Sequence, residues 1–163
     1  IYSIYIIHLE FWRICYIMKF KIKHMNPLKI YLADLTYDTV TISAESMPLN
    51  IGFVGAYCKK LFGNNVEITL FKYIDDLENA ITTSPPDILG LSNYVWSKNV
   101  SYEMIKTMSK IDPNTLIVWG GPNFPIDFPS QEKFMNKYDK VDVYVPVDGE
   151  VGFSNIVSES IES

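Results

Sequence analysis

The sequence contains very few of the residues that build metal sites, disulfides and acid–base centres. Its 163 residues include only two cysteines and two histidines. Cys15 and Cys58 form no CxxC pair, metal quartet or disulfide framework, so a reducing, cytoplasmic setting is expected. His8 and His24 both precede Met25, where a regular pattern of strands and helices begins. No histidine within that pattern can therefore act as a base or ligate a metal.

The motifs of several common ligand sites are also absent. Neither the dinucleotide-binding pattern G-x-G-x-x-G nor a P-loop follows the first predicted strand, and no nucleophile elbow G-x-S-x-G occurs. The third predicted strand ends in LSN, without the aspartate of a response-regulator receiver. A flavodoxin-type phosphate loop is imitated only weakly, by Thr36, Thr39 and Thr41. The net charge of −5, without a run of Lys or Arg, argues against a nucleic-acid partner.

Long apolar runs are missing as well. Within residues 1–24 the longest stretch without a charge is nine residues, because Glu10 and Arg13 interrupt the segment. A membrane span needs about 20 largely apolar residues, and the basic start and small-residue cleavage site of a signal peptide are absent. We therefore predict no membrane partner, a non-domain N-terminal extension over residues 1–24, and one domain over residues 25–163.

The composition that is present is that of a globular protein with a core, with 48% hydrophobic and 20% charged residues. Runs of apolar and branched residues predict strands over 28–34, 66–73, 87–94, 115–119 and 141–146. Apolar residues at helical spacing predict helices over 50–62, 75–81, 99–111, 130–138 and 153–161, with Asn99 and Ser130 as N-caps.

This alternation of strands and helices predicts an α/β fold. The expected form is a Rossmann-like (flavodoxin-like) three-layer sandwich with a five-stranded parallel sheet and strand order 2-1-3-4-5. Ligands of such folds bind beyond the carboxyl ends of the strands. The loops after the strands are therefore the places where a site is expected.

Small and aromatic residues occupy several of these loops. The loop over 35–50 is long for a connection between elements. Ser92, Tyr94 and Trp96 follow the third strand, Gly120-Gly121 ends the fourth, and Asp148-Gly149 follows the fifth. Each has a plain structural explanation as a turn, a packing residue or a local cap. Their joint placement at one edge of one sheet favours a ligand site with a broad, flat, partly apolar floor.

The segments PPDILGLSNYVWS, TLIVWGGPNFP and VDVYVPVDGEVGFSNIV resemble the N-terminal cobalamin-binding domain of B12-dependent radical SAM proteins. In that family the third strand ends in a serine followed by aromatic residues, and the fourth ends in Gly-Gly-Pro. The fifth leads to a Gly-Glu-Gly-Glu segment, whose first two positions are Val147 and Asp148 in this sequence. The resemblance covers about residues 28–160.

The resemblance implies that a corrin ring lies over the strand ends, above Gly120 and Gly121. Thr36 and Tyr37 stand where other cobalamin-binding folds often carry an Asp-x-His motif, so the lower face of cobalt is expected to lack a protein nitrogen ligand. Metal binding is thus expected only through the cobalt of the cofactor. The implied cofactor-binding residues are Thr36, Tyr37, Ser92, Tyr94, Trp96, Gly120, Gly121, Pro122, Asn123, Gly149 and Glu150.

The resemblance also implies chemistry that these residues do not supply. A radical SAM domain needs a C-x3-C-x2-C motif to hold an iron–sulfur cluster, and neither cysteine belongs to one. We therefore expect a non-catalytic fragment that binds cobalamin, with a radical SAM domain downstream in the same polypeptide holding the cluster and S-adenosylmethionine. Methyl transfer to an unreactive carbon is one reaction that this arrangement would serve. The alternatives are a stand-alone α/β binding or interaction module without the cofactor, and a flavin or nucleotide-sugar binder.

Overall fold

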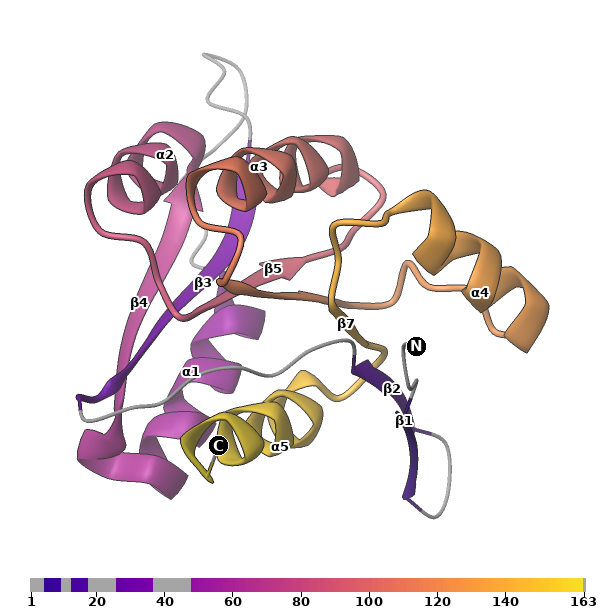
Figure 1. Ribbon diagram of the computed structural model, residues 1–163, viewed down its shortest axis with the longest axis horizontal. Coiled ribbons are helices and arrows are strands. Elements are labelled where there is room, and N and C mark those ends of the chain that lie inside the picture. Colours follow the sequence, from indigo (N-terminus) through magenta and orange to yellow (C-terminus); the bar gives the residue numbers. More distant parts are fainter. Residues whose placement is uncertain (1–4, 10–12, 18–25, 37–47, 163) are drawn as a thin grey trace.

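The computed structural model describes residues 26–36 and 48–162, together with the backbone of residues 5–9 and 13–17. A five-stranded sheet lies between two layers of helices (Figure 1). Its strands are β3 (Leu28–Thr36), β4 (Val66–Tyr73), β5 (Ile88–Ser92), β6 (Leu116–Gly120) and β7 (Val143–Val145). The helices are α1 (Leu49–Phe62), the short 3₁₀ helix η1 (Gly63–Asn65), α2 (Ile74–Thr83), α3 (Lys98–Ile111), α4 (Phe128–Lys137) and α5 (Gly149–Glu162).

The sheet is parallel throughout, with the strand order β4-β3-β5-β6-β7. In chain order this is 2-1-3-4-5, so the predicted α/β sandwich and strand order are confirmed. The register pairs Ala33 with Leu91, Ser92 with Gly120, and Gly120 with Val145. The carboxyl ends of four neighbouring strands therefore meet at one edge, as the fold class requires.

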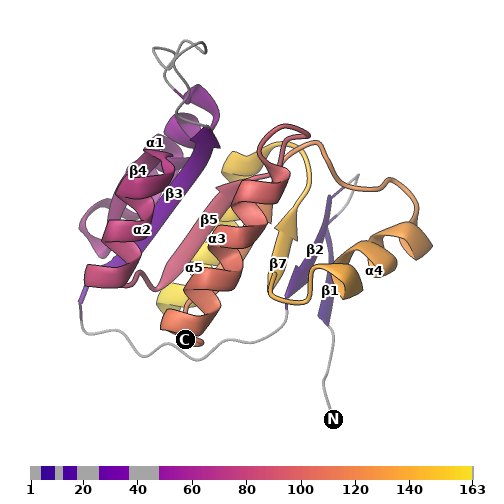
Figure 2. The same ribbon diagram turned by 90° about the horizontal axis from the view of Figure 1, so that it is seen from above.

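Helices cover both faces of the sheet, because the strand residues alternate between two buried sides. Helices α1 and α5 pack on one face, where Cys58 and Phe153 meet Leu32 of β3. Helices α2, α3 and α4 cover the other face, around the fully buried rings of Trp119 and Tyr144 (Figure 2). Burial raises the pKa of the Cys58 thiol to about 12, so Cys58 is a packing residue with no reactive thiolate near neutral pH.

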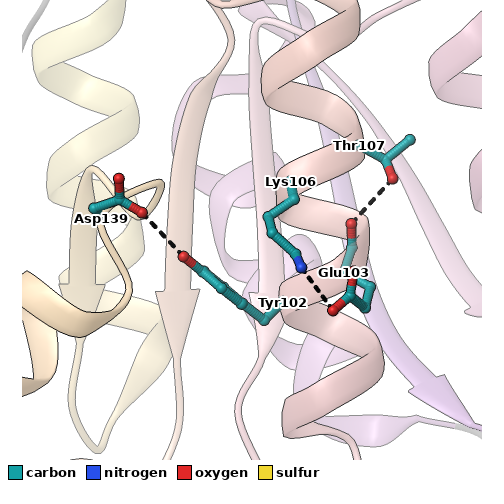
Figure 3. Close-up of polar contacts among 5 residues, drawn as sticks. All are labelled: Tyr102, Glu103, Lys106, Thr107 and Asp139. Carbon is teal, nitrogen blue, oxygen red and sulfur yellow. Dashed lines mark hydrogen bonds and ion pairs between the residues drawn. The ribbon is translucent and has the colours of Figure 1, made fainter.

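A hydrogen bond joins α3 to the turn after α4. The hydroxyl of Tyr102 donates to Asp139 Oδ1 over 3.1 Å, beside an ion pair between Lys106 and Glu103 on α3 (Figure 3). Burial and the neighbouring Asp139 carboxylate raise the pKa of Tyr102 to about 12. The hydroxyl therefore stays protonated and keeps donating at physiological pH.

The caps of two helices differ from the predicted ones. Helix α3 begins at Lys98 with Ser97 at its N-cap position, so the prediction of Asn99 as the cap is wrong. Helix α4 begins at Phe128, and Asp127 is its cap, with Oδ1 accepting the Ser130 N–H over 3.0 Å. The prediction of Ser130 as the cap is also wrong, because the proline that follows Phe128 fits the first turn and lets the helix start earlier.

An antiparallel pair of strands precedes the domain. Strands β1 (Tyr5–Leu9) and β2 (Arg13–Ile17) pair with each other, and β2 lies beside β7 in both views (Figures 1 and 2). The sequence pattern did not predict this pair, and the assignment of residues 1–24 as a non-domain extension stays a prediction. Across the described ranges, every helix is too short or too polar to cross a membrane.

Candidate functional site

A cavity of about 370 Å³ opens at the carboxyl edge of the sheet, between the N-terminal ends of α1 and α5. The ends of β3, β5, β6 and β7 form its base. Its lining residues are Leu32, Asn50, Ile51, Val54, Gly90, Leu91, Ser92, Tyr94, Val118, Gly120, Gly121, Pro122, Val145, Val147, Asp148, Gly149, Glu150 and Phe153. The cavity thus lies where the fold class predicts a ligand.

The base of the cavity is apolar and closely packed. Leu32, Val118, Val145 and Phe153 are all nearly or fully buried beneath it. A Cβ atom added at Gly90 would lie 2.7 Å from Leu32 Cδ2 and 3.0 Å from Phe153 Cε2. Glycine at this position therefore lets α5 approach the sheet closely, and no side chain projects from position 90 into the base of the cavity.

One side of the cavity carries a cluster of polar side chains, which we call the polar corner: Asp34, Asn50, Ser92 and Tyr94. Asn50 Nδ2 donates to Ser92 Oγ over 3.0 Å and to the Tyr94 hydroxyl over 3.3 Å. Asn50 Oδ1 is buried and has no hydrogen-bond partner among the described residues. The corner therefore holds a buried acceptor that no described residue satisfies.

Asp34 is the member of the polar corner that does not line the cavity, and it lies near the end of β3 beside the end of β5. Burial raises the pKa of its carboxyl group above the ordinary value of 3.8, and hydrogen bonds from Asn50 and Ser92 oppose part of that effect. Because desolvation dominates, the Asp34 carboxylate costs free energy in the folded state.

A second polar cluster, the closed network, consists of Asn93, Gly121, Asn123 and Tyr144. The fully buried Asn93 side chain donates to the Tyr144 hydroxyl and to the Asn123 carbonyl, and it accepts from Asn123 Nδ2 over 3.1 Å. The Tyr144 hydroxyl donates to the Gly121 carbonyl over 3.0 Å. These bonds tie the ends of β5, β6 and β7 together.

Gly121 owes its identity to this network. Its φ of +126° belongs to a region that side chains rarely adopt, and an added Cβ would lie 2.9 Å from the backbone oxygen of Asn93. The strand end therefore requires glycine at position 121 whether or not a ligand is bound. At Gly120, in contrast, an added Cβ would lie 3.3 Å from the Val145 carbonyl oxygen. That contact is close, but a small shift of the backbone could accommodate it.

The opposite rim of the cavity holds a strained residue. Val147 has a φ of +53° and is 67% exposed, and it is the one non-glycine residue with positive φ among those described. A β-branched residue at positive φ stores strain, and such strain is common at functional sites. Val147 stands at the first glycine position of the segment that the sequence resembles.

Most of the predicted site residues that the structure describes lie on this cavity. They are Ser92, Tyr94, Gly120, Gly121, Pro122, Gly149 and Glu150.

The other predicted residues lie off the cavity lining. Trp96 stacks on Tyr94 with ring centroids 4.8 Å apart and points to solvent. Asn123 belongs to the closed network, and Thr36 pairs with Tyr73 at the end of β3. Tyr37 lies outside the described residues.

The sequence reasoning missed Asp34, Asn50 and Asn93. A signal existed for two of them, because Asn93 directly follows Ser92 and Asp34 nearly ends its strand. Asn50 could not be identified, since its role depends on which way the first turn of α1 faces. Its place in that turn puts its amide against the ends of β3 and β5.

The chemistry of the site suits a ligand that brings its own reactive centre. Within residues 26–36 and 48–162, no three His, Cys, Asp or Glu side chains gather in a way that could hold a metal ion. The apolar base fits a flat ligand, and the polar side chains of Asn50, Ser92 and Tyr94 line one side of the cavity, where polar groups at that ligand's edge would lie.

Comparisons with known proteins agree with this geometry. A family model described as "B12 binding domain" matches residues 36–157. The cobalamin-dependent radical SAM methyltransferase TokK of Streptomyces tokunonensis is 38% identical over 73 residues, which are 45% of this chain and 10% of TokK. The 2-(S-pantetheinyl)-carbapenam-3-carboxylate methyltransferase of Streptantibioticus cattleyicolor is 29% identical over 119 residues, which are 71% of this chain and 17% of that enzyme.

Among solved structures, apo OxsB, a cobalamin-dependent S-adenosylmethionine radical enzyme, shares the fold. The TM-score is 0.56 at 18% sequence identity, and the match covers 82% of this chain and 19% of that chain. The chain thus spans between a tenth and a fifth of the length of these relatives.

Proposed function

The chain belongs to the B12 binding domain family, and from that premise we propose that its cavity binds cobalamin for methyl transfer by a radical SAM enzyme. The observation that carries the proposal is the cavity itself, with an apolar base over four strand ends and the polar side chains of Asn50, Ser92 and Tyr94 at one side. When bound, the cobalt of cobalamin would carry the methyl group, while the protein binds and orients the cofactor.

The cobalt has no histidine ligand from this domain in our proposal. The sequence holds no histidine between Met25 and Ser163, which supports the idea that the lower axial position lacks a protein nitrogen. Electron paramagnetic resonance of the Co(II) form should then show no splitting from a protein histidine nitrogen. A histidine splitting that persists in the 163-residue protein after His8 and His24 are both replaced by alanine would contradict this part of the proposal.

The partner in our proposal is a radical SAM domain of the same polypeptide, seated over the cavity. Exposed large apolar side chains occur in the first turns of α1 and in the loops that follow β5, β6 and β7, at the edge of the sheet that holds the cavity, and a covering domain would bury them. They are Leu49, Phe53, Val95, Trp96, Ile126 and Val147. The gene beyond the codon for Ser163 should encode a C-x3-C-x2-C motif, and an immediate stop codon would contradict the partner.

Titration of the purified protein with cyanocobalamin tests the central claim, with flavin mononucleotide as the competing ligand class. We expect saturable binding of one cyanocobalamin per chain, and no binding of the flavin. The reverse outcome would favour the flavin-binding alternative, and binding of neither would favour a module that has lost the cofactor.

A matched pair of variants on α1 tests the location of the cofactor. Val54 lines the cavity and Lys60 is exposed on the same helix, so Val54→Phe should block the cofactor and Lys60→Phe should not. We expect at least about a tenfold loss of cobalamin affinity for Val54→Phe, since overfilling a packed site costs about 1–3 kcal/mol. Equal affinities of the two variants would place the cofactor elsewhere.

A further inference from the structure

Strand β4 forms one outer edge of the sheet. The strand order ends at β4, and among the described strands only β3 pairs with it (Figure 1). The other outer edge, at β7, has β2 beside it. An outer strand presents a row of backbone N–H and C=O groups and is a template for pairing with another chain. The β4 edge is therefore the place where the sheet can accept a further strand.

The backbone groups of alternate β4 residues point out from this edge. On the other side of β3, the Lys29 N–H donates to Asp87 Oδ2 over 2.8 Å, and the Lys29 carbonyl accepts the Asp87 N–H over 2.9 Å. Its neighbour Ile30 therefore faces β4, where it lies opposite Ile68 and bonds to the residues on either side of Ile68. The backbone groups of Ile68 and Leu70 consequently point away from β3, toward the outer edge.

The side chains of Ile68 and Leu70 lie beside a groove between α1 and β4, with a volume of about 730 Å³. The helix contributes small residues to this groove, namely Gly52, Gly55 and Ala56. Leu70 consequently stays 45% exposed, although it lies within a strand. A Cβ atom added at Gly52 would meet no described atom within 4 Å. The groove therefore has room for the side chains of an added strand.

A second copy of the chain fits this edge in one register. Lys59 Nζ donates to the Val66 carbonyl oxygen over 2.9 Å and occupies the first outward-pointing group of the strand. Antiparallel pairing about a two-fold axis at Leu70 leaves that bond intact and sets Ile68 opposite Lys72 of the partner subunit. An axis nearer the start of β4 would place Val66 opposite a partner residue and compete with Lys59.

The charges along β4 favour the same arrangement. Antiparallel pairing brings Glu67, near the start of the strand, close to Lys72 of the partner subunit, near the end of its strand. Parallel pairing of two copies would instead set each of these charges beside its own counterpart, which is destabilising. The edge is thus complementary to itself in charge, as an interface about a two-fold axis requires.

We propose that two copies of this chain pair through β4, antiparallel about a two-fold axis at Leu70. The two sheets then form one continuous sheet with five strands from each copy, and Leu70 meets Leu70 of the partner subunit on the axis. No β4 residue lines the cavity at the carboxyl edge. This inference therefore does not depend on the proposed binding of cobalamin.

Sedimentation equilibrium of the 163-residue protein without cofactor tests the pairing. We expect a reversible monomer–dimer equilibrium in the wild-type protein. Leu70→Lys sets two ammonium groups against each other on the axis and should weaken the dimer at least about tenfold. The matched control Leu61→Lys changes a leucine that is 52% exposed and lies outside the groove, so it should leave the equilibrium unchanged.

A mixture of the Leu70→Lys and Leu70→Glu proteins distinguishes a lost interface from a damaged fold. Opposite charges meet on the axis in the mixed dimer, so the mixture should associate more tightly than either variant alone. A mixture that associates no more tightly than its components would overturn the axis at Leu70. The pairing itself would be overturned by a wild-type protein that stays monomeric up to about 1 mM, or by a Leu70→Lys protein that dimerises like the wild type.

Discussion

The polar corner and the closed network lie at the ends of adjacent strands, yet their hydrogen bonding differs. In the closed network, the amide of Asn93 donates and accepts entirely within the protein. In the polar corner, Asn50 Nδ2 donates to Ser92 and Tyr94, whereas the Asn50 side-chain oxygen has no hydrogen-bond partner among the described residues. A satisfied buried network stabilises the fold, whereas an unsatisfied one costs stability until something binds. Closeness to the cavity is therefore not enough to make a residue a ligand contact.

The glycine pair shows the same distinction. Gly121 lies on the cavity, but its positive φ and its contact with Asn93 make it part of the closed network. Gly120 has more room and ordinary backbone geometry. Of the two, Gly120 is therefore the better position for probing contact with a ligand.

The largest effect that separates the two clusters is expected from Gly121→Val. The new side chain meets the Asn93 backbone at 2.9 Å in a region of φ that valine avoids. We expect a loss of at least about 3 kcal/mol in the free energy of unfolding, measured in urea. Gly120→Ala should cost less than half as much. Near-equal losses would mean that the strand end adapts, and that Gly121 is retained for a ligand instead.

The next largest effect is expected from Asn93→Leu. This change removes the partners of the Tyr144 hydroxyl and Asn123 and should cost about 2–4 kcal/mol of unfolding free energy. The matched change Asn50→Leu should cost less than about 1 kcal/mol, because it also removes an unsatisfied buried acceptor. Chemical unfolding of both variants checks the contrast. A larger loss for Asn50→Leu would invert our assignment of the two clusters.

The fold was predicted correctly from the sequence because the spacing of apolar residues along the chain reflects which side chains are buried. The five runs of apolar residues became the five strands, and the strand order followed from the common solution for such a chain. Two helix caps were predicted wrongly, because Ser97 and Asp127 lie within three residues of Asn99 and Ser130 and are also residue types that cap helices. Which polar residue caps a helix depends on backbone angles that periodicity does not report.

The position of the site was predicted from the sequence, but its hydrogen bonds were not. The loops after the strands gave Ser92, Tyr94 and the glycine pair, because their position follows from topology alone. The partners that distinguish the two clusters, Asn50 and Asn93, depend on side-chain directions across elements far apart in the sequence. A single sequence carries no record of those directions.

A smaller effect is expected on the opposite rim, at Val147. Its φ of +53° suits glycine, and its exposed side chain gains little stability from hydrophobic burial. We expect Val147→Gly to raise the free energy of unfolding by about 1 kcal/mol, since relief of the strain outweighs the added flexibility of the unfolded chain. A urea midpoint that stays the same or falls would mean that the valine packs usefully in the ligand-free protein.

The smallest effect is expected at Asp34, and it depends on pH. Burial raises the pKa of this carboxyl group in the folded state above 3.8, so the folded protein holds the proton more tightly than the unfolded chain. Well below pH 3.8 the group is protonated in both states and costs nothing. Stability falls as pH rises from about 3.8 through the raised folded-state pKa, because folding must then accommodate a half-buried carboxylate.

Asp34→Asn should therefore be more stable than the wild-type protein at pH 7, and this pH-dependent difference should vanish well below pH 3.8. Urea midpoints measured across this range check the sign. A variant that is less stable at pH 7 would show that the hydrogen bonds from Asn50 and Ser92 outweigh desolvation. With the expected sign, the polar corner keeps a carboxylate that weakens the fold, whereas the closed network keeps only groups that strengthen it.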